Sequence, residues 1–250
     1  MESHLEKQNG DVLQKSFKEM ISTLPRKSCW GLPEDQYQYQ SFWFSPPFLQ
    51  GALSAQQQFQ AQPTDIILCS FPRTGTAWDP KDTFVSLYHF IARHCNSRNT
   101  QPIQLDEAFE LFYEGISSYG PYWDHVLGYW KASLERPDKL MFLKYEDLVE
   151  DTVLYLKKTA EFMGYPFSSE EQQQGVPENI VKMCSFDNLS GLEVNKTGRH
   201  REGKGNMETE NNIFFRKGKV GDWKNYLTTE MAQRLDQRTL QQLSSSGLSL

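Results

Sequence analysis

The sequence predicts a single α/β domain over residues 1–250, built on a central parallel sheet that lacks a member. Short apolar runs that end in Pro- and Gly-containing loops alternate with longer helical patterns, which is typical of strands joined by helices. A loop suited to holding a phosphate follows the first of these runs. Only two runs are convincing strands, and a sheet buried on both faces ordinarily has more.

The composition limits the classes of partner. The chain has 26 basic and 32 acidic residues and a net charge of −6, which argues against general nucleic-acid binding but leaves room for a local basic pocket. Four cysteines stand without metal-ligand spacing, so reduced thiols and no metal site are expected. The N-terminus is polar and no apolar run is long enough to span a membrane. We therefore expect a cytoplasmic protein.

The first part of the chain predicts two helices with a loop between them. Apolar residues recur at helical spacing over residues 12–24, and Pro25 ends that pattern. A loop rich in Gln, Tyr and Phe is expected next. Ser45 then fits an N-cap with Pro46 at the first helical position, so a short helix is expected to begin there.

The remaining elements follow from the same signals. Apolar runs predict strands over residues 65–70 and 140–145. A capping box from Ser168 to Glu171 would open one of the later helices. Helices are expected at residues 79 to about 94, 123–134, 150–163 and 168–184, and from about 229, with a mobile surface loop at 191–212.

Three motifs carry the chemistry, and the first is FPRTGTAW at residues 71–78. A strand that runs into this loop would direct backbone N–H groups and two hydroxyls at one point. Gly75 permits close approach and Arg73 adds a charged fork. The loop lacks the GxxxxGK[ST] motif of P-loop nucleoside triphosphatases. A plain strand-to-helix turn is the alternative reading of this motif alone.

The second motif, DPKDTFVSLYHF, follows at once, and the third, FFRKGKVGDWKNYL, lies at residues 214–227. Asp79 and Pro80 fit the start of a helix that carries Ser86 about two turns in. By itself Ser86 reads as an incidental helix serine rather than a phosphate ligand. The third motif gathers three cations around Gly218, and by itself it reads as a solvated basic turn.

Together these blocks resemble the soluble, PAPS-dependent sulfotransferases, especially the plant flavonol type; PAPS is 3′-phosphoadenosine 5′-phosphosulfate. FWFSPPFLQG, DIILCSFPRTGT, DPKDTFVSLYHF, YGPYWDHVLGYWKASLERPDKLMFLKYEDL, CSFDNLSGLEVNKTG and FFRKGKVGDWKNYLT stand in family order. The resemblance implies a P-loop-like fold and transfer of a sulfonate from PAPS to a hydroxyl of a small acceptor such as a flavonoid, a steroid or an oxime. It implies no metal, and it leaves the acceptor and the oligomeric state open.

The resemblance also implies roles for cofactor-binding residues. Ser86 and the loop Arg216-Lys217-Gly218 would hold the 3′-phosphate, Tyr145 would lie near the nucleotide, and Trp78 and Phe186 would enclose the adenine. In the family the first loop carries a lysine where this chain has Arg73, and the geometry of the two cations differs. That loop would hold the 5′-phosphosulfate end through Arg73, Thr74, Gly75, Thr76, Ala77 and Trp78.

The same resemblance implies an internal deletion between Trp78 and Asp79. In the family a long stretch separates these two motifs and supplies a helix, a central strand, the catalytic histidine and an arginine for the 3′-phosphate. The histidines that remain stand outside the family's catalytic context, so packing or surface roles are expected for them. No catalytic residue is assigned, and activity is in doubt. A remnant that only binds nucleotide and a product that does not fold stably are the alternatives. The histidines are His4, His89, His94, His125 and His200.

Overall fold

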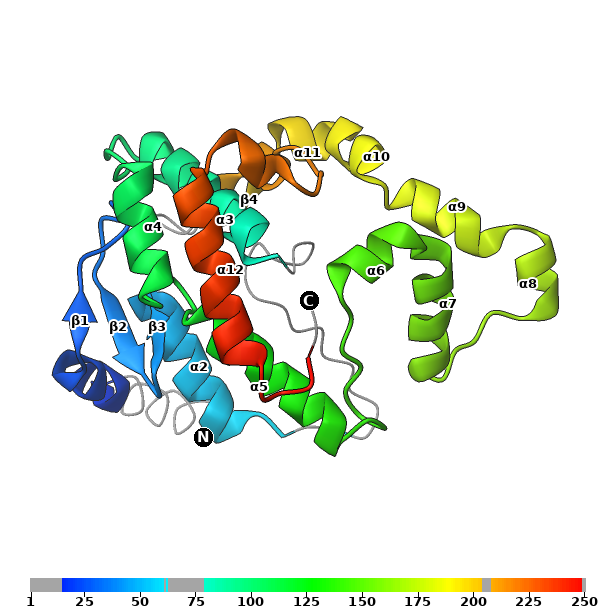
Figure 1. The fold of residues 1–250 in the computed structure, drawn as a ribbon, viewed down its shortest axis with the longest axis horizontal. Helices are drawn as coiled ribbons and strands as arrows, with labels where there is room; N and C mark the ends of the chain where they lie inside the picture. The colour runs from blue at the N-terminus through cyan, green and yellow to red at the C-terminus, as the bar shows by residue number, and fades with distance from the viewer. Residues whose placement is uncertain (1–14, 61, 63–78, 204–207, 249–250) are drawn as a thin grey trace, which may run out of the picture.

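The computed structural model describes residues 15–60, 62, 79–203 and 208–248. Most elements form a helical body, and a group of helices forms an arm that extends to one side of it (Figure 1). The predicted helix over 12–24 is described from residue 15 and ends at residue 23, before Pro25. The strand predicted over 65–70 lies outside the described residues.

A three-stranded antiparallel sheet lies at one edge of the body. It comprises β1 (Arg26–Lys27), β2 (Gln36–Tyr39) and β3 (Phe42–Phe44), in that order. Gln40 and Ser41 both have positive φ in the two-residue turn between β2 and β3, as a tight hairpin requires. The prediction of a loop here was therefore wrong for residues 36–44, where alternating polar and aromatic residues pair as a hairpin.

The helices after the sheet begin where the sequence predicts. Helix α2 (Pro46–Gln58) has Ser45 at its N-cap and a proline in its first turn, and α3 (Pro80–Ser97) has Asp79 at its N-cap. The Asp79 side chain accepts a hydrogen bond of 2.9 Å from the backbone N–H of Lys81. Proline in the first turn loses no intrahelical bond, and Asp79 satisfies one of the free N–H groups, so both starts are fixed locally.

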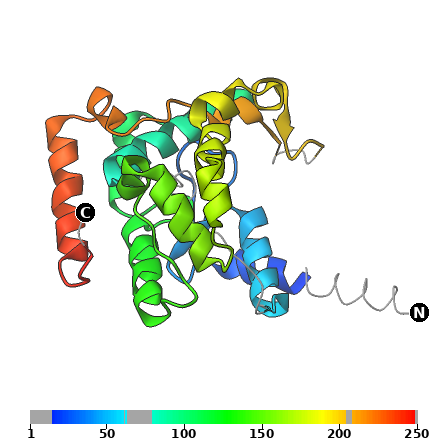
Figure 2. The same cartoon turned by 90° about the vertical axis from the view of Figure 1, so that its right-hand side faces the viewer.

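Helix α3 is the centre of the core. It packs with α4 (Leu105–Tyr113), α5 (Tyr122–Glu135) and α12 (Thr229–Leu243), which surround it in the body (Figures 1 and 2). Phe84 of α3 is fully buried and lies edge-on to Phe109 of α4 at 5.6 Å between ring centroids. The helix expected over 123–134 is confirmed as α5, in which Trp123 is buried and Leu134 is exposed.

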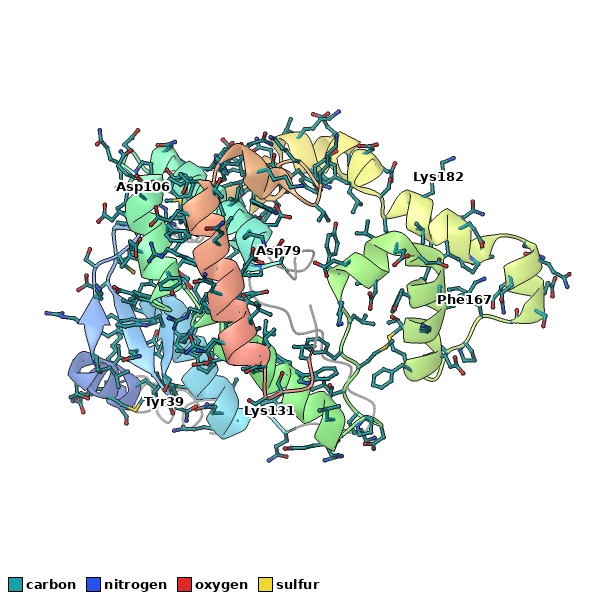
Figure 3. All side chains as sticks on the ribbon, viewed as in Figure 1. Tyr39, Asp79, Asp106, Lys131, Phe167 and Lys182 are labelled. Atoms are coloured by element: carbon teal, nitrogen blue, oxygen red, sulfur yellow. The ribbon has the colours of Figure 1, made fainter. Side chains whose placement is uncertain are left out.

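The arm comprises α6 (Tyr145–Glu150), α7 (Thr152–Phe162), α8 (Ser169–Gln173) and α9 (Val176–Met183). Figure 3 shows Phe167 and Lys182 on it, apart from the body. The strand predicted over 140–145 is wrong: residues 140–144 form no strand and Tyr145 begins α6. A run of apolar residues becomes a strand only when a neighbouring strand pairs with it.

The single helix predicted over 168–184 is also wrong, because left-handed Gly175 (φ +70°) separates α8 from α9. The predicted capping box is confirmed: Ser168 accepts from the backbone N–H of Glu171, and Glu171 accepts from that of Ser168. Only Ala160 and Pro177 are buried between residues 145 and 191. The arm therefore has little core of its own.

The stretch predicted as a mobile loop, 191–212, contains helix and strand among its described residues, so the prediction of a loop was wrong there. It contains α11 (Glu193–Thr197) and an antiparallel pair, β4 (Arg199–His200) with β5 (Thr209–Glu210). Short α10 (Phe186–Gly191) precedes it, and the 3-10 turns η2 (Asn211–Phe214) and η3 (Asp222–Asn225) follow. The side chain of Asn211 donates to the carbonyl of Val194 at 2.8 Å, which ties this segment back to α11.

Both sheets within the described ranges are antiparallel. Among the described residues, no helix combines the length and apolar character of a membrane span. In the same part of the chain, no group of three or more His, Cys, Asp and Glu side chains is placed to hold a metal ion.

Candidate nucleotide phosphate pocket

A small pocket lies between α3 and the segment that follows β5. Ser86, on the second turn of α3, and Arg216, just after η2, line it together. These two residues are distant in sequence, and each reads ambiguously by itself. A hydroxyl and a guanidinium on one concave surface can both donate hydrogen bonds to a phosphate. The full lining is Ser86, His89, Phe90, Arg93, Ile213, Phe214 and Arg216.

Asp222 of η3 holds the cationic loop in place. Its buried carboxylate forms an ion pair with Arg216 and accepts hydrogen bonds from Lys217 at 2.8 Å and from Asn225 at 2.9 Å. Burial by itself raises the pKa of Asp222, but the hydrogen bonds from Lys217, Arg216 and Asn225 prevail and hold it well below its usual range. The carboxylate therefore stays ionised and orders both cations of the loop.

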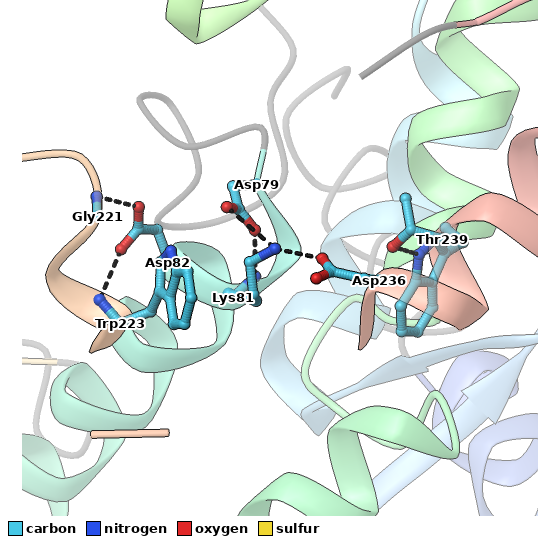
Figure 4. A network of polar contacts seen from close by, with 8 residues as sticks. Asp79, Lys81, Asp82, Gly221, Trp223, Asp236 and Thr239 are labelled. Atoms are coloured by element: carbon cyan, nitrogen blue, oxygen red, sulfur yellow. Dashed lines mark hydrogen bonds and ion pairs between the residues drawn. The ribbon is translucent and has the colours of Figure 1, made fainter. Parts of the chain in front are cut away.

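A second buried carboxylate, Asp82, connects the loop to α3. It accepts hydrogen bonds from the backbone N–H groups of Gly221 at 2.6 Å and Trp223 at 3.0 Å (Figure 4). Asp82 lies one turn before Ser86 on α3, so these bonds fix η3 against the helix that carries the pocket serine. The same region holds Lys81, which pairs with Asp236 of α12.

Phe186 and Gly218 are also brought together. Gly218 has φ +60°, and a Cβ built on it would lie 2.5 Å from the Phe186 ring. The ring also meets Phe215 edge-on at 5.8 Å between centroids. Only glycine permits both this backbone conformation and this close approach. The loop Arg216-Lys217-Gly218 therefore packs directly on the aromatic residue that begins α10.

Tyr145 is not brought to the pocket. It begins α6 and packs against the main core. Burial first, and then the charges of Glu146 and Asp82, raise the pKa of its hydroxyl. The hydroxyl therefore stays protonated and can donate a hydrogen bond. The predicted phosphate loop, comprising Arg73, Thr74, Gly75, Thr76, Ala77 and Trp78, lies outside the described residues.

Four residues of this region were not predicted from the sequence: Asp82, His89, Arg93 and Asp222. His89 and Arg93 follow Ser86 by three and seven positions, which places all three on one face of a helix. That spacing was an available signal. Nothing in the sequence indicates that the two carboxylates bind the loop. Asp82 contacts a segment 139 residues away, and Asp222 contacts the loop only because the chain folds back there.

Two other histidines lie in partly buried positions. Burial, with a further contribution from the Arg98 charge, lowers the pKa of His94 to about 4, and burial lowers the pKa of His125 to about 4. His94 lies face to face with Phe90 and His125 meets Tyr129. The packing role expected for these two histidines therefore agrees with their surroundings.

Comparisons with known proteins agree with the family resemblance of the sequence motifs. Residues 79–247 match the sulfotransferase domain family. A flavonol sulfotransferase-like protein of Flaveria bidentis is 39% identical over 313 aligned positions, covering 94% of this chain and 100% of the relative. The flavonol 4′-sulfotransferase of Flaveria chlorifolia is 38% identical over 315 positions, covering 94% and 97% respectively. Both alignments are longer than this chain of 250 residues, so the chain is shorter than these relatives.

The fold agrees. A mouse sulfotransferase crystallised in complex with PAP superimposes with a TM-score of 0.67 at 22% identity, covering 84% of this chain and 95% of that one. The α/β class predicted from the sequence is thus confirmed by the fold that the two proteins share. The family match spans the helix that carries Ser86 and the loop of Arg216, the two sides of the pocket. The chain belongs to the sulfotransferase family.

Proposed function

We propose that this chain binds 3′-phosphoadenosine 5′-phosphosulfate and its product, adenosine 3′,5′-bisphosphate, and that the pocket of Ser86 and Arg216 receives the 3′-phosphate. PAPS supplies an activated sulfonate, which the family reaction transfers to a hydroxyl of a small acceptor. The observation that carries the proposal is that Ser86 and Arg216 line one pocket. The names of the relatives favour a flavonoid or another small hydroxylated acceptor and a cytosolic location.

The residues present fit a phosphate. Ser86 offers a hydroxyl, Arg216 offers a guanidinium, and Lys217 adds a second positive charge held by the same carboxylate. The Phe186 ring, which packs on Gly218, would provide a flat apolar surface for one face of the adenine. Aromatic stacking and charge-assisted hydrogen bonds together are the usual means of holding a nucleotide.

We also propose that the chain is one domain with an internal deletion between Trp78 and Asp79. Three observations support it. The family match begins at Asp79, and the alignments are longer than the chain. The arm leaves large apolar side chains exposed, among them Tyr165 at 76% and Met183 at 58%. A chain that had kept a full core would be expected to cover more of that surface.

With the deletion, nucleotide binding is the activity that this chain retains best, and turnover is the activity it loses. The second candidate function is accordingly a non-catalytic protein that binds the nucleotide alone. The missing base is the specific feature that favours it, since no histidine of this chain lies in the family's catalytic context. The two functions share the pocket and differ only in turnover.

Calorimetry with the purified chain tests the binding proposal. Adenosine 3′,5′-bisphosphate should bind more tightly than adenosine 5′-monophosphate, which lacks the 3′-phosphate. Replacing Arg216 by Ala should cost about 1.5–3 kcal/mol of binding free energy, as loss of a charge-assisted hydrogen bond does. Lys219→Ala is the matched control, because Lys219 belongs to the same loop but does not line the pocket. Equal affinity for the two nucleotides, or unchanged affinity in Arg216→Ala, would refute the assignment.

A further inference from the structure

His89 has a polar atom that lacks a partner. Its side chain lies one turn after Ser86 and lines the same pocket. Among the described residues, no group forms a hydrogen bond with its Nε2, although that atom is buried. The ring meets Tyr226 edge-on at 4.5 Å between centroids, which fixes its plane. A buried polar atom without a partner is costly, so a ligand that supplies one would be favoured here.

Arg93 adds a cation to the lining of the same pocket. It is exposed, lines the pocket, and lies four residues beyond His89 on α3. Arg216 is paired with Asp222, whereas Arg93 has no carboxylate partner among the described residues. Its positive charge is therefore available to an anion that enters between α3 and the loop.

The charges around His89 come from three elements. Arg93 lies on its own helix, Arg216 and Lys217 lie on the loop after η2, and Asp222 lies on η3. Burial first, and then Arg216 and Arg93, lower the pKa of His89 below 6.5, and Asp222 opposes them only in part. In the free protein the imidazole is therefore neutral at neutral pH. A phosphate dianion in this pocket would reverse the balance of charge.

We propose that His89 and Arg93 are further ligands of the nucleotide 3′-phosphate, and that His89 binds it as an imidazolium, so that nucleotide binding takes up a proton. This inference rests on the proposed function and assigns two residues to the same pocket. The proton goes to the imidazole, whose Nε2–H then donates to a phosphate oxygen. Arg93 contributes a guanidinium from the same helix that carries Ser86 and His89.

The direction of the pH dependence follows. The dianion raises the pKa of His89 in the complex above its value in the free protein. Affinity therefore increases as the pH falls through the higher pKa of the complex, and levels off below the lower pKa of the free protein. At a pH between the two, binding takes up close to one proton.

Calorimetry at pH 7 in buffers of different ionisation enthalpy measures that proton. The ligands are adenosine 3′,5′-bisphosphate and adenosine 5′-monophosphate, whose difference isolates the 3′-phosphate. We expect a net uptake of roughly 0.5–1 proton in the wild type and almost none in His89→Gln. Affinity for the bisphosphate should fall about tenfold in His89→Gln and about fivefold in Arg93→Gln. Affinity for the monophosphate should not change.

Two control variants lie on α5, away from the pocket. His125→Gln removes another partly buried imidazole, and Lys131→Gln removes a cation near the opposite end of the body (Figure 3). Both should keep the proton uptake and the preference for the bisphosphate. If His89→Gln does not fold, NMR titration of the histidines in the wild type, with and without the bisphosphate, supplies the same readout. The pKa of one imidazole should then rise when the bisphosphate binds.

The outcomes separate the two claims. If the wild type binds both nucleotides equally, the proposed function fails and this inference falls with it. If the bisphosphate is preferred but no proton is taken up, or if both α3 variants keep that preference, the inference alone is overturned. Proton uptake that persists in His89→Gln would assign it to another group and would also overturn it.

Discussion

The carboxylate of Asp82 accepts a 2.6 Å hydrogen bond from the backbone N–H of Gly221, 139 residues further along the chain. With the second bond from Trp223, it fixes η3 against the helix that carries Ser86. Asp222 in η3 then holds Arg216 and Lys217. The two sides of the proposed phosphate pocket are therefore joined through two buried carboxylates rather than through the pocket residues themselves.

Replacing Asp82 by Asn should weaken this junction. The amide keeps one acceptor oxygen but loses the charge and one of two backbone hydrogen bonds, so the free energy of unfolding should fall by about 1.5–3 kcal/mol. Urea denaturation followed by circular dichroism measures it. Asp138→Asn, at an exposed site where the carboxylate pairs with exposed Arg136, should change stability by less than about 0.5 kcal/mol. Equal effects of the two variants would contradict the role given to Asp82.

Gly218→Ala should destabilise the loop and weaken nucleotide binding together. The alanine must keep the positive φ of Gly218, and its Cβ would lie 2.5 Å from the Phe186 ring. Together these should lower the free energy of unfolding by about 2–4 kcal/mol. The matched control is Gly128→Ala in α5, where a Cβ meets nothing within 4 Å. Removing a glycine from a helix interior should stabilise the protein by about 0.5–1 kcal/mol. Thermal unfolding distinguishes the opposite signs, and a neutral Gly218→Ala would show that the ring can move aside.

Stability should fall as the solution is acidified from pH 6.5 towards 4. The pKa values of His94 and His125 are lowered to about 4, mainly by burial, while the unfolded chain titrates near the ordinary value. Between pH 4 and pH 6.5 the unfolded state binds more protons than the folded state. The stability present above pH 6.5 is therefore lost as the pH falls through this range. The loss should be about 1–3 kcal/mol in total, allowing for partial solvent screening.

Urea titrations at several pH values test this dependence. Because carboxylates also titrate in acid, the informative comparison is between the wild type and the double variant His94→Gln/His125→Gln. The double variant should show a shallower slope between pH 6.5 and 4.5. His200→Gln, at an exposed site, is the control and should leave the slope unchanged. Parallel slopes in all three proteins would rule out these histidines as the source.

Sulfotransferase turnover should be no more than trace. No histidine stands in the family's catalytic context, and a general base contributes about 10²–10⁴-fold to rate. The family resemblance implies that Arg73 stands where the first loop has a lysine and that Trp78 stands where an arginine holds the 3′-phosphate, so we expect the donor to be positioned less firmly as well. The assay uses labelled PAPS with phenolic, steroid and oxime acceptors, beside a full-length relative. Turnover within tenfold of that relative would contradict the proposed deletion.

The starts of the helices could be predicted because their signals lie within one turn. Ser45 with Pro46, and Asp79 with the proline after it, mark α2 and α3, and the capping box of Ser168 marks α8. In each case the proline restricts φ or a side chain satisfies a nearby N–H group. The β2–β3 hairpin was missed although its alternation is local, because its turn uses Gln40 and Ser41 at positive φ rather than Asn-Gly.

The sequence by itself determined the family, the positions of the principal helices and the separate motifs of Ser86 and Arg216. The tertiary structure decided that these two residues share a pocket, that Asp222 pairs with Arg216 and Lys217, and that residues 140–144 are not a strand. Capping and helical periodicity act between residues a few positions apart, so they can be read along the chain. A strand needs a partner strand, and a buried carboxylate needs donors, and the chain can bring these from any distance.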